Sequence, residues 1–125
     1  MLDLLVRDGR VVLPDRVDDL DIGIQNGKIA GLYTKGRGPE AKEVLDAAGK
    51  LIFPGAIDTH VHLNDPGYTW RETFHEGTAA AAVGGVTTVI DMPLQNEPAT
   101  TSAAILQDKL EAISGRASVD FCLWG

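Results

Sequence analysis

Two histidines and an aspartate alternate in the stretch GAIDTHVHLNDPG, residues 55–67. Side chains of a β-strand point alternately to its two faces, so Asp58, His60 and His62 are predicted to share one face. Same-face neighbours lie roughly 6.6 Å apart along a strand, and two imidazoles at that separation can converge on one ion. Imidazole suits zinc, and two inward histidines without a partner are costly to bury. His60 and His62 are therefore predicted metal ligands.

Other residues with reactive or polar side chains carry separate predictions. Asp58 is expected to be either a residue that orients a ligand histidine or a core carboxylate, and the sequence favours neither. His75 is expected on a solvated helix face. Asn96 is a predicted substrate contact, with a turn role in QNEP as the stronger alternative. Cys122, within an expected strand, is predicted to be a small buried apolar residue.

Alternating strands and helices after Pro54 must position these residues. The expected strands begin near residues 56, 86 and 118, and a period of about 30 residues is the length of a βαβ unit. The sequence NDPG after His62 places this histidine at the carboxyl end of the first strand. Sites of parallel α/β folds form at that end.

Capping signals define the two predicted helices. Thr69 and Glu72 match a capping box, so the first helix is expected to start there and to end at Gly84–Gly85. The second is expected to begin at Thr101 and to end at Gly115. The apolar residues expected on one face of the second helix are Leu106, Leu110 and Ile113.

Residues 1–53 are predicted to form short antiparallel strands of a small β-sandwich or half-barrel without catalytic groups. The dipeptides Asp8–Gly9 and Asn26–Gly27 are two-residue hairpin signals. The apolar pairs that these turns would place opposite each other are Val6 with Val11 and Ile24 with Ile29.

Two motifs in this order carry a family resemblance. PGAIDTHVHLNDPG resembles the first-strand signature of the amidohydrolase superfamily, in the branch of dihydroorotases, hydantoinases and allantoinases, and GGVTTVIDMP resembles the second-strand signature. The lead-in GKIAGL…VLDAAGKLIFPG is similar to the start of these enzymes' β-sandwich. The resemblance implies a β-sandwich segment over 1–53, then the first three strands and two helices of a (β/α)8 TIM barrel over 54–125, incomplete.

The resemblance also implies a mechanism. A centre of two divalent ions, usually zinc, would supply a metal-bound hydroxide that attacks a ring amide, with His60 and His62 on the more buried ion. Asn64 stands where dihydroorotases carry an arginine for the substrate carboxylate, and it cannot form that charged pair. Asn64 is therefore a predicted substrate contact. MPLQNEPAT resembles allantoinases, so opening of allantoin to allantoate in purine catabolism is expected. Dihydroorotase and dihydropyrimidinase or hydantoinase activity are the alternatives.

Only three of the eight strands of a barrel are expected here, and a barrel typically needs ~250 residues. The chain is predicted to be the N-terminal segment of a longer enzyme and inactive alone, because the carboxylated lysine and other ligands that the resemblance implies would lie beyond it. The longer enzyme is expected to be a homo-oligomer acting on a small cyclic ureide. The rival class is a catalytically dead structural relative, which the retained histidines disfavour.

Composition limits the partners and the compartment. The chain is 44% apolar and 23% charged, as in globular proteins, with a net charge of −7. This negative charge argues against nucleic acid or an anionic membrane as a partner. The sequence contains no run of 18 apolar residues, so no membrane span is expected. Cys122 is the sole cysteine, so an intrachain disulfide is impossible and a reducing cytoplasmic location is expected.

Overall fold

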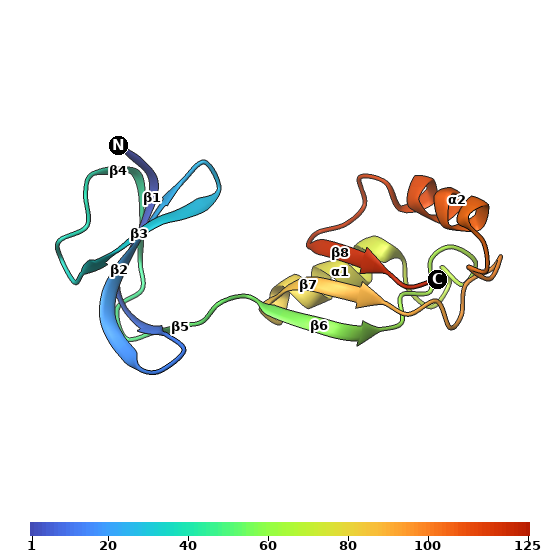
Figure 1. Ribbon diagram of the computed structural model, residues 1–125, viewed down its shortest axis with the longest axis horizontal. Coiled ribbons are helices and arrows are strands. Elements are labelled where there is room, and N and C mark those ends of the chain that lie inside the picture. The colour runs from blue at the N-terminus through green and yellow to red at the C-terminus, as the bar shows by residue number, and fades with distance from the viewer. The chain divides into compact units, whose positions relative to one another are not determined.

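The computed structural model describes residues 1–125, which divide into two compact units, Met1–Pro54 and Gly55–Gly125 (Figure 1). The first unit is made of strands only. Its elements are β1 (Leu2–Val12), β2 (Val17–Gln25), β3 (Lys28–Thr34), β4 (Ala41–Asp46) and β5 (Leu51–Ile52).

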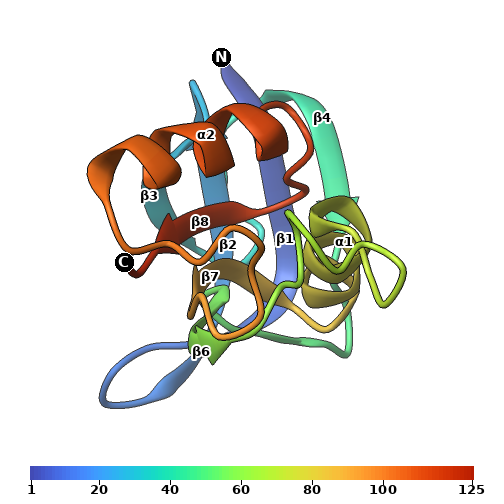
Figure 2. The same cartoon turned by 90° about the vertical axis from the view of Figure 1, so that its right-hand side faces the viewer.

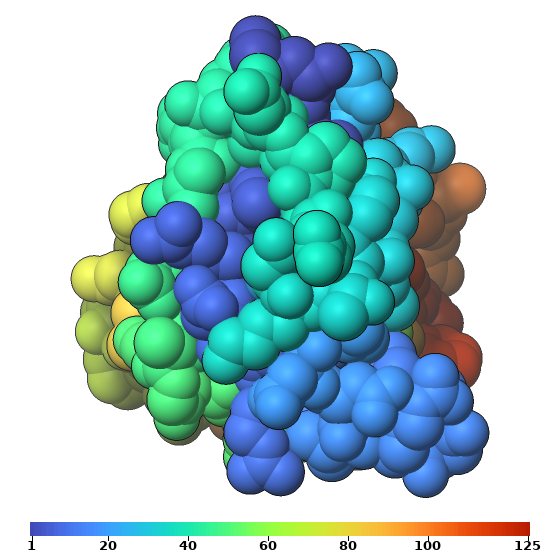
Figure 3. All heavy atoms as spheres, turned by 90° about the vertical axis from the view of Figure 1, so that its left-hand side faces the viewer, coloured from blue at the N-terminus to red at the C-terminus, as the bar shows by residue number.

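One mixed sheet forms the first unit, in the order β3-β2-β1-β4, with β5 also pairing with β1. In Figure 3, atoms from the start of the chain (dark blue) show between turquoise and green segments, as expected for a strand inside the sheet. The prediction of antiparallel strands holds for β1, β2 and β3. It is wrong for β4 and β5, which run parallel to β1, because the chain crosses after β3 to the far side of β1.

The two hairpin predictions have different outcomes. Asn26 and Gly27 form a turn with φ of 52° and 71°, and Ile24 pairs with Ile29 as predicted. The Asp8–Gly9 hairpin is wrong, because β1 continues through it and the register shifts there. Asp8 has a φ of 64°, the left-handed conformation that a bulge uses as readily as a hairpin turn does. Val11 therefore pairs with Asp18 instead of Val6.

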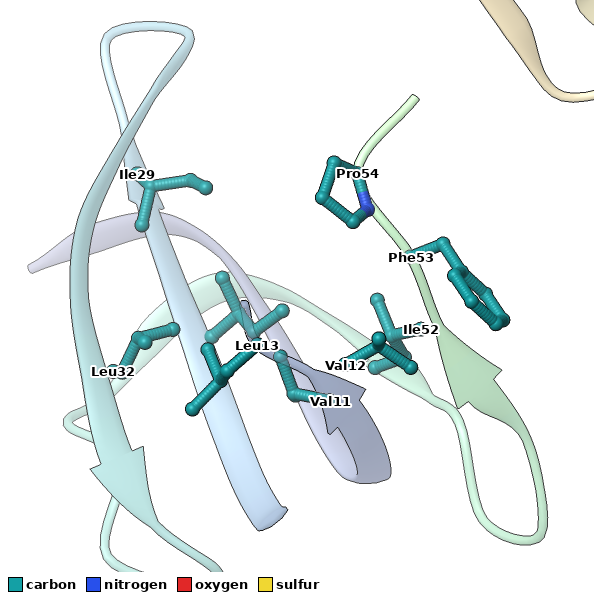
Figure 4. A pocket seen from close by; sticks show the side chains of 9 residues that line it. Val11, Val12, Leu13, Ile29, Leu32, Ile52, Phe53 and Pro54 are labelled. Carbon is teal, nitrogen blue, oxygen red and sulfur yellow. The ribbon is translucent and has the colours of Figure 1, made fainter. Parts of the chain in front are cut away.

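An apolar hollow of about 190 Å³ lies within the first unit (Figure 4). Ile29 and Leu32 line it from β3, and Ile52 and Phe53 line it from the segment that includes β5. Figure 4 shows the side chains of Val11, Val12 and Leu13 between these two groups. The sheet therefore has a hydrophobic face, as one layer of a sandwich would have.

The second unit alternates strands and helices, as predicted. Its elements are β6 (Ala56–Val61), α1 (Phe74–Val83), β7 (Val86–Asp91), α2 (Ala103–Ile113) and β8 (Asp120–Leu123). The three strands are parallel in the order β6-β7-β8. Figure 2 looks at their carboxyl ends, where the loops after β6 and β7 gather. Neither helix is long and apolar enough to cross a membrane.

Both helices contribute to one core with the sheet. Phe74 of α1 and Ile113 of α2 are fully buried and belong to a cluster with Leu63 and Val89. The Phe74 ring meets that of Phe121 on β8 edge to face, with centroids 5.0 Å apart. Burial of these apolar side chains is the main stabilising contribution in this unit.

The first helix begins later than the sequence indicates. Its N-cap is Thr73, whose side chain accepts a hydrogen bond from the Glu76 backbone nitrogen, while the Glu76 side chain accepts from the Thr73 nitrogen. The predicted capping box at Thr69 and Glu72 is therefore wrong. The predicted end is confirmed, with Gly84 as C-cap and Gly85 at a φ of 84°.

Three further predictions, on the start of α2, its buried face and Cys122, need correction. Helix α2 is capped by Ser102 instead of Thr101. On its inner face Ile113 is buried as predicted, but Leu110 is 37% exposed and Lys109 is buried instead. Cys122 is exposed, because Phe121 takes the helix-covered side of β8 and its neighbour must point to the other side.

Candidate metal centre

His60 lies in β6, and His62 follows directly after the strand. Their rings meet edge to face with centroids 5.0 Å apart, and both residues are exposed. The structure thus brings the two predicted ligands together at the carboxyl end of β6. The helix-packed residues Val61 and Leu63 alternate with them in sequence, which places the histidines on the opposite side.

A backbone contact defines which nitrogen of His62 is free. Its Nδ1 lies 3.0 Å from the carbonyl oxygen of Met92, which follows β7. A carbonyl oxygen can only accept, so Nδ1 is the donor in this contact and Nε2 is the nitrogen that the backbone leaves free. Metal-bound histidines are commonly held in this way, with one nitrogen donating to a carbonyl and the other on the metal.

The donor set around the histidines fits part of a zinc site. His60 and His62 border an open hollow of about 440 Å³ together with Met92, Pro93 and Leu94. Imidazole nitrogens suit zinc, but a zinc site needs three or four protein ligands. No group of three or more His, Cys, Asp or Glu side chains is gathered here. The chain therefore brings together two nitrogen donors, fewer than a zinc site needs, and their role as metal ligands stays a prediction.

Asp58 precedes the histidines on β6 and is exposed. Its Oδ1 accepts a hydrogen bond of 3.1 Å from the backbone nitrogen of His60. Both interpretations of Asp58, a core carboxylate and a residue that orients a ligand histidine, stay predictions. The carboxylate contacts the backbone of a predicted ligand and not its ring, so a role in orienting that ligand stays a prediction.

Asn64 lies in the loop after β6 and is only 6% exposed. Its side-chain nitrogen donates to Glu72 at 3.2 Å, whereas its side-chain oxygen is buried without a hydrogen-bond partner. A buried acceptor without a partner is unfavourable and uncommon in folded proteins. Asn64 thus has one unused acceptor near the end of β6, and its contact with substrate stays a prediction.

Asn96 lies in the loop after β7 and both ends of its amide are engaged inside the chain. The nitrogen donates to the Leu63 carbonyl at 3.2 Å, and the oxygen accepts from Lys109. Asp91 completes this buried network, because its two carboxylate oxygens accept from the Leu63 nitrogen at 2.8 Å and from Lys109 at 2.6 Å. These internal hydrogen bonds give Asn96 a structural role, and its predicted contact with substrate stays a prediction.

Comparison with known proteins identifies the family. The Amidohydrolase family matches residues 51–123, more than half of the chain. This chain belongs to the amidohydrolase family.

Relatives of this amidohydrolase with close sequences are named allantoinase. One from Desulfitobacterium hafniense (strain Y51) is 46% identical over 123 residues, which are 98% of this chain and 27% of the relative. Another from Salmonella choleraesuis (strain SC-B67) is 42% identical over 118 residues, 94% of this chain and 26% of the relative. The chain thus spans about a quarter of the length of these relatives.

A solved structure shares the fold of the amidohydrolase chain. The L-hydantoinase (dihydropyrimidinase) from Arthrobacter aurescens matches with a TM-score of 0.92 and 36% identity, covering 100% of this chain and 28% of that one. The family resemblance read from the two sequence motifs is therefore confirmed.

Sequence reasoning missed Lys109 and the structural role of Asp91 in this amidohydrolase. Lys109 occupies the buried face of α2, one residue before Leu110. A lysine on an otherwise apolar helix face is a signal for a buried ion pair, because an unpaired ammonium is too costly to bury. Its partner could not be found from spacing, since Asp91 lies 18 residues earlier, in another element.

Proposed function

We propose that this chain forms the first-strand part of the metal centre of a cyclic amidohydrolase that opens allantoin to allantoate. The observation that carries the proposal is the pairing of His60 and His62 at the carboxyl end of β6. The allantoinase names of relatives at 42–46% identity support the substrate. The helices and three parallel strands support a (β/α)8 barrel as the complete fold.

Each group of this chain has a defined part in the proposed reaction. His60 and His62 would hold one of two divalent ions, most simply zinc, with Nε2 of His62 as donor. A bound divalent ion supplies Lewis acidity, which polarises an amide carbonyl and lowers the pKa of water to about 7. Asp58 would help to fix His60, and Asn64 in the loop after β6 would contact the neutral ureide ring.

A second substrate class has support from the structural match. The neighbour with a TM-score of 0.92 is an L-hydantoinase (dihydropyrimidinase), so a hydantoin or dihydropyrimidine ring is the alternative. Asn64 disfavours dihydroorotate, because an uncharged amide cannot form a bidentate charged pair with its carboxylate. We further propose a homo-oligomer that acts in purine catabolism in the cytoplasm, where the free, exposed Cys122 would stay reduced.

The test uses the complete gene product that contains this chain, assayed with allantoin, hydantoin, dihydrouracil and dihydroorotate. Allantoin turnover is expected to dominate, and His60→Ala or His62→Ala should lower bound metal and turnover by orders of magnitude. His75→Ala is the matched control, because His75 is exposed on α1 outside the hollow. Asn64→Arg should reduce allantoin turnover, since it adds a cation that a neutral ring cannot pair.

Two results would overturn the proposal. Full metal content in the His60→Ala/His62→Ala double variant would remove the metal assignment. Efficient hydrolysis of dihydroorotate without action on allantoin would remove the substrate assignment.

A further inference from the structure

A buried polar network lies directly behind the two histidines, on the helix side of the sheet. Asp91 is fully buried, Lys109 is 1% exposed and Asn96 is 6% exposed. The three side chains come from the end of β7, from α2 and from the loop between them. Asp91 and Asn96 contact the backbone of Leu63, the residue after His62, and Lys109 contacts both of these side chains.

This network holds Leu63 at both of its backbone polar groups. Asp91 accepts from the Leu63 nitrogen at 2.8 Å, and Asn96 donates to the Leu63 carbonyl at 3.2 Å. Lys109 bridges the two holding side chains by donating to both. The backbone that follows His62 is therefore held by Asp91 and Asn96, and Lys109 holds these two side chains in place.

The residue before His62, Val61, is hydrogen-bonded to Met92, which directly follows Asp91. The Met92 nitrogen donates to the Val61 carbonyl at 2.8 Å, and the Met92 carbonyl accepts from Nδ1 of His62. Asp91 and Met92 are consecutive, so one short segment contacts the backbone on both sides of His62 and the ring itself. A shift of that segment would turn the His62 imidazole.

Stability alone does not require an ion pair at this place. Replacement of a buried ion pair by apolar side chains of similar volume is often neutral or stabilising. Apolar side chains could fill the space under the sheet, but they could not accept from the Leu63 nitrogen or donate to its carbonyl. What the polar network adds is a fixed backbone direction at Leu63.

We infer that Asp91, Asn96 and Lys109 are positioning residues that fix the Leu63 backbone and so aim Nε2 of His62 at the metal. This inference rests on the proposed function of His62 as a metal ligand. The positioning residues touch neither metal nor substrate, and they act through Leu63. Loss of groups that orient metal ligands typically weakens metal binding by about 10–100-fold.

The experiment measures zinc affinity of the complete, metal-stripped gene product by competition with a chromophoric chelator. Asn96→Leu retains most of the side-chain volume but removes the hydrogen bond to Leu63. It is expected to weaken zinc binding about tenfold, at the lower end of the range for orienting groups. Co²⁺ absorption spectra of the same variant should show altered coordination.

Ile113→Ala is the matched control. Ile113 is fully buried on α2, like Lys109, and its truncation leaves a cavity without touching Leu63 hydrogen bonds. The control should lower the melting temperature but leave zinc affinity unchanged. If Asn96→Leu does not fold, Asn96→Ala takes its place, and its zinc affinity is compared with that of Ile113→Ala in the same way.

The outcomes separate the inference from the proposed function. Weaker zinc binding by the Asn96 variant, with normal binding by the Ile113 variant, supports the positioning role. An equal loss of zinc affinity in the Asn96 and Ile113 variants, or no loss in a folded Asn96 variant, overturns the inference but leaves the proposed function standing. Absence of zinc binding by the unmodified protein overturns both.

Discussion

At the scale of single residues, Asp91 and Lys109 form an ion pair that is buried in the second unit. Lys109 Nζ lies 2.6 Å from Asp91 Oδ2, and the side chains of Asp91 and Lys109 are 0% and 1% exposed. Two charges removed from water need close geometry and further hydrogen bonds to offset desolvation. Leu63 and Asn96 supply these bonds. Removal of one charge is therefore expected to cost far more than removal of both.

The first prediction follows from this asymmetry. Lys109→Met should lower the free energy of unfolding by about 3–5 kcal/mol, because it leaves the Asp91 carboxylate buried without its cation. The double variant Asp91→Asn/Lys109→Met should regain a large part of that loss, since no charge remains buried. Urea unfolding of the complete gene product at pH 7 measures both values. A double variant as unstable as Lys109→Met would contradict the explanation.

At the scale of elements, the first helix shows how tertiary contacts choose between equivalent local signals. The sequence TWRETFHE contains two consecutive capping boxes, which start four residues apart. The structure uses Thr73 and Glu76, while Glu72 accepts from Asn64. Asp65, which is buried, accepts from the backbone nitrogen of Phe74, the first residue of the helix. Because of these contacts, Thr69 and Glu72 stay in the loop between β6 and α1, and the helix starts at Phe74.

The second prediction concerns the pH dependence of this cap. Hydrogen bonds from the backbone and side chain of Thr73 hold the pKa of the Glu76 carboxyl below its ordinary value of 4.5. A carboxyl with a lowered pKa in the folded state contributes stability above about pH 4.5, which is lost as the pH falls through the folded pKa. Glu76→Gln should therefore make unfolding less dependent on pH in the acid range.

Urea unfolding at pH 6 and at successively lower pH values measures this effect. The expected change is modest, because Glu76 is exposed and solvent screens its interactions. Asp108→Asn is the control, since the Asp108 side chain is exposed on α2 and makes no hydrogen bond. An equal change of pH dependence in both variants would argue against a specific role of the cap.

At the scale of the whole molecule, each of the two units leaves apolar surface uncovered. In the first unit Ile29 is 69% exposed beside the hollow of Figure 4. In the second unit Ile57 is 63% exposed on β6, whose outer edge pairs with no other strand. Exposed apolar side chains and unpaired strand edges both favour association with other chains.

The third prediction is that the 1–125 polypeptide, expressed alone, self-associates, binds zinc weakly and does not hydrolyse allantoin. Two histidines are fewer ligands than a zinc site needs. Ile29→Lys/Leu32→Lys should shift the population toward monomer, as measured by size-exclusion chromatography with light scattering. Gln25→Lys/Thr34→Lys is the control that adds lysines at exposed positions without removing apolar surface.

A monodisperse monomer of 1–125 that unfolds cooperatively and turns over allantoin would contradict this prediction. It would mean that the two histidines suffice for the reaction.

Local patterns determined the alternation of strands and helices after Pro54, the Asn26–Gly27 turn and the shared face of His60 and His62. Each of these depends on near neighbours in the sequence, through strand periodicity, turn chemistry or capping. The family also followed from two short motifs, because their residues are contiguous. These are the features that a chain encodes within a few residues.

Only the tertiary structure decided where the long-range partners lie. Asp8–Gly9 became a bulge inside β1, because β2 pairs along the whole strand and the Asp21 side chain accepts from the Asp8 nitrogen. Lys109 is buried because Asp91 and Asn96 meet it from another part of the chain. The energy of a buried charge depends on partners distant in sequence, and no local pattern contains them.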